Sequence, residues 1–82
     1  MARLDKIVET MWRSQANVAF KDLCRVVESM GYVLRRTRGA HLIYRHETRP
    51  ELPLINLQAD GSKAKPYQVR QVLDIRDTFG LA

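Results

Sequence analysis

The sequence predicts an α+β domain in which a three-stranded antiparallel sheet carries helices packed on one face. Apolar residues recur at helical spacing before Gly31 and again after Pro66. Between these two residues, polar and apolar side chains roughly alternate, which is typical of strands. Strands that follow one another through short loops form an antiparallel meander, which helices can cover on one side. With 82 residues, the chain is expected to form a single domain over residues 1–82.

An amphipathic helix of about three turns is predicted near the N-terminus. Its apolar stripe consists of Leu4, Ile7, Val8 and Met11. A helix this short is not stable alone, so it must pack on the domain or on a partner. The polar loop that follows ends at Asn17, which is expected to cap the next helix. We therefore expect an N-terminal helix and loop over residues 1–17, ahead of an αβββα core over residues 18–82.

The second helix is predicted from about Ala19 to Met30, and Gly31 is expected to end it. Its apolar stripe consists of Phe20, Leu23, Cys24, Val27 and Met30. Cys24 is the only cysteine in the sequence, so there is no disulfide framework. Its place on the apolar stripe favours a core role over a reactive one.

A β-hairpin is predicted next, with its turn at Gly39–Ala40. The three predicted strands span residues 32–38, 41–46 and 54–58. The loop between the second and third strands contains two prolines, which cannot sit in a central strand. A polar connection over residues 59–65 leads to the last helix, where Pro66 suits the first position and Gly80 ends the helix.

Positive charge is concentrated in one part of the chain. The formal net charge is +5, and the surplus lies between Tyr32 and Pro50, where Glu47 is the only acidic residue. The arginines of this segment are Arg35, Arg36, Arg38, Arg45 and Arg49. A localised basic patch is typical of nucleic-acid-binding proteins. Charge alone is equally compatible with a solvated arginine face that maintains solubility.

His41 lies just past the predicted turn, and strand alternation decides which side it faces. Leu42 and Tyr44 point to one side of the sheet, whereas His41, Ile43 and Arg45 point to the other. If helices cover the Leu42 side, His41 and Arg45 share the open face. An imidazole among guanidinium groups suits the binding of a phosphodiester and the transfer of protons on it. A lone histidine on a strand is also compatible with a structural role.

The chain carries several short motifs in a specific order. They are Phe20-x-x-Leu23, Gly31-Tyr32, Arg36-x-x-Gly39-Ala40-His41, the apolar strand Leu54–Gln58, and Lys63-Ala64-Lys65 before the final helix. In these motifs, from about Val18 to Leu81, the chain resembles the HicA-type toxins of bacterial type II toxin–antitoxin pairs. It is similar to the longer-chain branch of that family, which has an extra N-terminal helix.

This resemblance implies a fold similar to the double-stranded-RNA-binding domain. It also implies an mRNA interferase that cleaves mRNA without a metal ion or another cofactor, and a HicB-type antitoxin that inhibits it. The catalytic histidine of the family falls on His41. The family usually has Gly-Ser-His where this chain has Gly39-Ala40-His41, so one hydroxyl is missing beside the expected site.

The chemistry of RNA suggests a mechanism at this histidine. Neutral His41 could take the proton from a 2′-OH, which then attacks the adjacent phosphorus and leaves a 2′,3′-cyclic phosphate and a 5′-OH. Fixed cations would stabilise the charge that builds on the phosphorane oxygens. The expected RNA-binding residues are Arg35, Arg36, Arg38, Arg45, Lys63 and Lys65. The sequence does not identify the general acid, for which His46, Tyr44, Lys63 and Lys65 are all candidates.

Two other classes of function are compatible with the sequence. One is an RNA-binding module without catalysis, which reads the shape of duplex RNA. The other is a protein-interaction domain whose arginines dock on an acidic partner. No carboxylate–histidine cluster suggests a metal site. No signal peptide or membrane-spanning stretch is recognised, so we expect a cytoplasmic protein.

Overall fold

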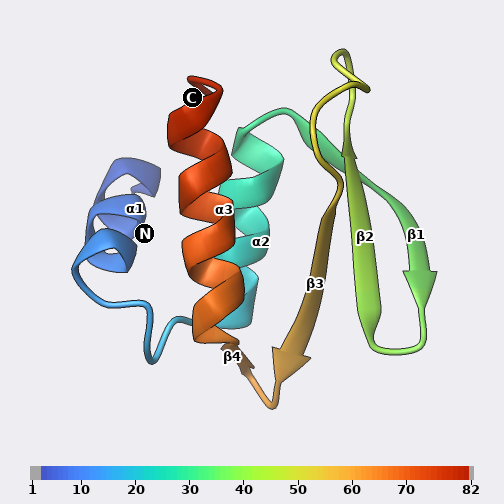
Figure 1. Cartoon of the computed structure of the whole chain (residues 1–82). Helices are drawn as coiled ribbons and strands as arrows, with labels where there is room; N and C mark the ends of the chain where they lie inside the picture. The colour runs from blue at the N-terminus through green and yellow to red at the C-terminus, as the bar shows by residue number, and fades with distance from the viewer. Residues whose placement is uncertain (1–2, 82) are drawn as a thin grey trace.

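A computed structural model describes residues 3–81 of the chain. In this part of the chain, three helices accompany a four-stranded antiparallel sheet. Figure 1 shows how these elements are arranged. In chain order the elements are α1 (Leu4–Arg13), α2 (Phe20–Ser29), β1 (Tyr32–Arg38), β2 (His41–His46), β3 (Ile55–Asp60), β4 (Lys63–Ala64) and α3 (Pro66–Thr78). The α+β class and both strands of the predicted hairpin are confirmed.

The predicted number of strands is wrong, because the sheet contains a fourth strand in the order β1-β2-β3-β4. The third strand continues to Asp60, and the chain then turns at Gly61 and pairs back through β4. Ala64 also donates its backbone N–H to the carbonyl of Val18 at 2.8 Å, which fixes the new strand to the segment before α2. A strand of two residues is too short to show an alternating pattern, so it could not be predicted from the sequence.

The start of α2 also differs from the prediction. Ala19 is the N-cap residue and makes no side-chain capping bond, whereas Asn17 adopts a positive φ of 60° in the preceding loop. The first amide of the helix, that of Phe20, instead donates to the carbonyl of Ser62 at 3.0 Å. The β3–β4 hairpin therefore supplies an acceptor for a group that a capping side chain usually satisfies.

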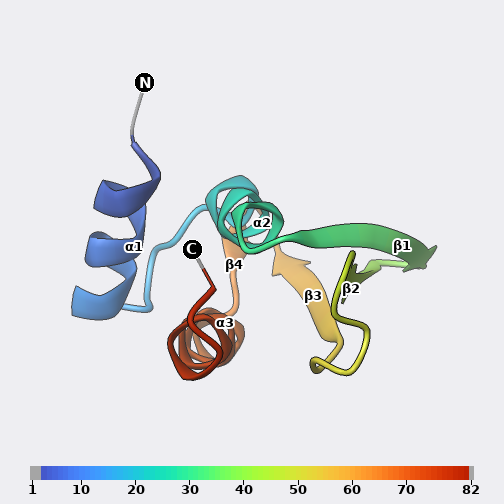
Figure 2. The same ribbon diagram turned by 90° about the horizontal axis from the view of Figure 1, so that it is seen from above.

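The core lies between the helices and one face of the sheet. Its most completely buried side chains are Tyr32, Met11, Leu23, Ile55, Leu57, Leu73, Val26, Val27, Val69 and Val72. Helix α1 packs on α3 and α2 and buries the predicted residues Ile7, Val8 and Met11. Figures 1 and 2 show α1 and the β1–β2 hairpin at opposite ends of the molecule, so the predicted basic segment lies far from this helix.

Candidate functional site

His41 lies on a sheet face that points away from the buried core, as strand alternation predicts. On β2, Tyr44 is 2% exposed on the core side, whereas His41 and Arg45 are exposed and Ile43 is half-buried. The turn at Gly39–Ala40 joins the two strands of the hairpin, and Gly39 has a φ of +56°. We call the side of the sheet that carries His41, Ile43 and Arg45 the open face.

A β-bulge at Arg35 adds arginines to the open face. In the β1–β2 ladder, Leu34 pairs with Tyr44 but Arg36 pairs with Ile43, so Arg35 is an extra residue. Because of this shift, Arg36 stands beside Ile43, and in the same register Arg38 pairs with His41. An unbroken register would have turned Arg36 toward the helices, since one residue of slip exchanges the two faces.

Two adjacent hollows occupy the open face. Arg38, Gly39, His41, Ile43 and Asn56 line one of them. Arg35, Arg36, Ile43, Arg45 and Leu54 line the other. Ile43 lines both hollows, so they form one continuous surface. We call the four arginines around it, Arg35, Arg36, Arg38 and Arg45, the arginine patch.

The arginine patch keeps its charge available for a ligand. Within residues 3–81, the four ion pairs that form involve Arg3, Arg13, Arg49 and Arg70, none of which belongs to the patch. Guanidinium groups without a carboxylate partner bind phosphate oxygens in a forked geometry. The open face is therefore suited to a polyanion.

The two predicted RNA-binding lysines lie in different places. Lys65 donates from Nζ to Oε1 of Gln58 at 3.1 Å, and Gln58 is the cross-strand partner of His41. Lys65 therefore approaches the His41 end of the open face. Lys63 is exposed on β4 and lines a separate hollow beside Lys21, which none of the patch arginines lines.

Asn56 is a candidate site residue that the sequence analysis did not identify. It lies on β3 opposite Ile43, and its Oδ1 is 3.0 Å from Nδ1 of His41. The sequence alone does not point to this residue, because the cross-strand neighbour of an asparagine in a short strand is known only once the register of the sheet is known. The register brings the two side chains together on the open face.

Two of the residues considered as the general acid do not reach the open face. His46 is 8% exposed, and its Nδ1 accepts the backbone N–H groups of Thr48 at 3.3 Å and Arg49 at 3.0 Å. Its ring packs edge-on against Tyr32. Burial raises the pKa of Tyr44 well above its ordinary value, and a hydrogen bond to Cys24 raises it further. Both side chains stabilise the core.

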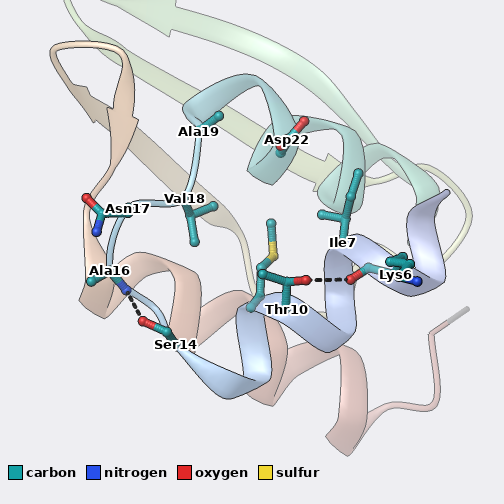
Figure 3. Close-up of a pocket in the computed structure, with 10 residues that line it drawn as sticks. Lys6, Ile7, Thr10, Ser14, Ala16, Asn17, Val18, Ala19 and Asp22 are labelled. Carbon is teal, nitrogen blue, oxygen red and sulfur yellow. Dashed lines mark hydrogen bonds between the residues drawn. The ribbon is translucent and has the colours of Figure 1, made fainter. Parts of the chain in front are cut away.

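A fourth hollow lies at the other end of the molecule, between α1, the loop after it, and α2. Ile7, Met11 and Val18 contribute apolar side chains to it, and Lys6 and Asp22 are among the polar residues around it (Figure 3). It shares no lining residue with the two hollows of the open face. In residues 3–81, no group of three or more His, Cys, Asp and Glu side chains is arranged to hold a metal ion.

None of the helices described here is both long enough and apolar enough to cross a membrane. Comparison with curated proteins and with solved structures gives no significant match. The family model described as the HicA toxin of bacterial toxin–antitoxin systems matches residues 20–78, which include α2, the whole sheet and α3. This match covers the open face and most of the core. The chain therefore belongs to the HicA toxin family of bacterial toxin–antitoxin systems.

Proposed function

We propose that this toxin is a metal-independent endoribonuclease that cleaves mRNA in the cytoplasm. One observation carries the proposal: an exposed imidazole, His41, lies within a patch of arginines that have no carboxylate partner among residues 3–81. The arginines would bind the phosphates, and the imidazole would move protons. Membership of a toxin family supports an activity that harms the cell, and cleavage of mRNA would be such an activity.

The proposed first step is attack by the ribose on its own phosphodiester. Neutral His41 accepts the proton of the 2′-OH while the 2′-oxygen forms a bond to phosphorus. The bond from phosphorus to the 5′-oxygen breaks, which leaves a 2′,3′-cyclic phosphate and a 5′-OH. Arg38 is the cross-strand partner of His41 and lines the same hollow, so its guanidinium is placed to stabilise charge on the phosphorane oxygens.

The leaving 5′-oxygen needs a proton, and Lys65 is the best-placed candidate to supply it. Lys65 is held by Gln58, which lies directly across from His41 in the sheet. Lys63 lines a different hollow, and His46 and Tyr44 are buried on the core side. This arrangement supports one proton acceptor and one donor at the same end of the open face.

The shape of the open face supports recognition of the RNA backbone, similar to that of a double-stranded-RNA-binding domain. The strand tyrosines Tyr32 and Tyr44 are both buried in the core. Proteins that bind single-stranded nucleic acids stack the bases on aromatic side chains. On β1, β2 and β3, the open face presents no tyrosine or tryptophan that could serve in this way. Arginines that contact phosphates would bind RNA with little base preference.

A non-catalytic RNA-binding module is a second candidate, because Ala40 lacks the hydroxyl that the related toxins usually carry at this point. The deciding experiment incubates the purified, folded protein with RNA and with DNA of the same sequence in EDTA. We expect cleavage of RNA alone, with cyclic phosphate ends, because DNA has no 2′-OH. Binding of RNA without cleavage favours the second candidate, and loss of cleavage on adding EDTA contradicts a metal-independent reaction.

RNA binding is expected to weaken steeply with salt. If the four arginines of the patch each contact one phosphate, raising the salt from 50 to 200 mM should lower the affinity by roughly 50- to 150-fold, because bound counterions are released. Replacing both Arg36 and Arg45 with alanine should reduce the slope of log affinity against log salt by about two. Binding can be followed by fluorescence anisotropy of a labelled RNA.

The matched control removes the same charge from the helices, in the double variant Arg13→Ala/Arg25→Ala. Arg13 and Arg25 are exposed on α1 and α2. This variant should keep nearly the wild-type salt dependence. Equal slopes for the two double variants would show that RNA does not bind the open face.

We also propose that the antitoxin is of the HicB type and covers the open face. In the part of the chain that the structure describes, no carboxylate pairs with the arginine patch, so the patch offers an acidic partner several cations, and covering His41 would block the reaction. The Arg36→Ala/Arg45→Ala variant should lose at least about tenfold in antitoxin affinity, since truncating one member of a buried charge pair costs roughly 2–5 kcal/mol. Titration calorimetry measures this loss. Unchanged affinity, with a loss for the Arg13→Ala/Arg25→Ala control, would place the antitoxin on the helices instead.

A further inference from the structure

We propose that Asn56 is a positioning residue that fixes the tautomer and orientation of His41. This inference rests on the proposed role of His41 as the base. The observation behind it is the contact of 3.0 Å between Oδ1 of Asn56 and Nδ1 of His41 on the open face. Asn56 does not itself react with RNA in this scheme.

The direction of this hydrogen bond determines where the proton of the imidazole lies. The amide oxygen of Asn56 can only accept a hydrogen bond, so Nδ1 of His41 must be the donor. A neutral imidazole carries a single N–H, which leaves the lone pair on Nε2. Nε2 is then the atom that accepts the proton of the 2′-OH. The opposite tautomer would put the N–H where the base is needed.

The sheet holds the two residues in this relation. Asn56 pairs with Ile43 across the ladder, and His41 pairs with Gln58, so the contact runs diagonally between neighbouring strands. Gln58 does not compete for the imidazole, because its side-chain oxygen accepts from Lys65. Rigid strands hold such side chains more accurately than loops do.

An amide also orients the imidazole without adding charge. A carboxylate at position 56 could accept the same hydrogen bond, but it would bring a negative charge next to Arg38, which lines the same hollow. That charge would repel the phosphates of RNA. Asn56→Asp should therefore keep the tautomer of His41 and raise KM, whereas Asn56→Leu, which has no acceptor, should lose the tautomer and lower kcat.

The tautomer can be measured directly by NMR, independently of any activity. A long-range ¹H–¹⁵N correlation spectrum at about pH 8.5, where imidazoles are neutral, shows which ring nitrogen carries the proton. The chain contains two histidines, and the structure predicts opposite tautomers for them. His41 should carry its proton on Nδ1. His46 should carry it on Nε2, because its Nδ1 accepts two backbone N–H groups.

The comparison uses wild type, Asn56→Leu and Asn56→Asp. Gln58→Leu is a control for the NMR measurement alone: it should leave the His41 tautomer unchanged, but its kcat is not compared because Gln58 holds Lys65. In Asn56→Leu, the Nδ1–H form of His41 should be lost and His46 should be unaffected. The value of kcat should fall at least about tenfold, since the imidazole loses both the tautomer and the orientation that make it an effective base. KM should stay near the wild-type value, because the arginines still bind the phosphates.

Two results would overturn the inference. One is an Nε2–H proton on His41 in the wild-type protein, and the other is an unchanged kcat in Asn56→Leu despite a changed tautomer. If the wild-type protein does not cleave RNA, the proposed function fails. The spectrum still decides whether Asn56 fixes the tautomer of His41.

Discussion

Replacing His41 with alanine is expected to lower the rate of RNA cleavage by about 10²- to 10⁴-fold, which is the usual contribution of a general base. The affinity for RNA should change little, because the arginine patch remains. The fold should also be retained, since His41 is exposed and surface substitutions usually change stability by no more than about 0.5 kcal/mol. Cleavage is measured on purified protein in EDTA, with circular dichroism as a check on folding.

His46→Ala is the informative comparison, because it removes the other imidazole of the chain. His46 is buried and accepts two backbone N–H groups, so this variant should lose stability rather than catalytic rate per folded molecule. Cleavage by folded His41→Ala at the wild-type rate would contradict the mechanism. If the wild type itself does not cleave, Ala40→Ser is the next variant to test, because it restores the missing hydroxyl.

Most of the fold could be predicted because glycine and proline residues mark the boundaries between its helices and strands. Gly31 and Pro66 separate two helical patterns from an alternating one, and they lie at the boundaries that the structure shows. Strand alternation also placed His41 on the exposed side and His46 on the opposite side. Both predictions depend on local geometry alone, in which a strand has a period of two residues and a helix of 3.6.

The features that could not be predicted depend on contacts between distant segments. The bulge at Arg35 is visible only in the pairing of β1 with β2. The contact between Asn56 and His41 needs the β2–β3 register, which a loop with two prolines leaves undetermined in the sequence. Similarly, Ser62 replaces the expected cap of α2 through a hairpin that follows about forty residues later. In this case a distant segment provides the hydrogen-bond acceptor that the sequence pattern had assigned to the nearby Asn17.

Gly31, the glycine before β1, should be the most sensitive of the four glycines to substitution. Gly31 has a φ of +95°, and a Cβ at this position would lie 2.6 Å from Nε2 of His46. In Gly31→Ala, the left-handed backbone should cost about 1–2 kcal/mol, and the overlap with a packed ring about 1–3 kcal/mol more. A domain of this size has a free energy of unfolding of roughly 4–12 kcal/mol. The substitution should therefore remove a large share of it, which urea denaturation would measure.

Gly61→Ala is the matched control for this prediction. Gly61 also has a positive φ, of +63°, but no atom lies within 4 Å of the position that its Cβ would take. This variant should lose only the backbone contribution of about 1–2 kcal/mol. The difference between the two variants then measures how firmly the core holds the His46 ring. Equal losses would mean that the ring moves aside freely, and that His46 does not fix the junction between α2 and the strand that leads to the arginine patch.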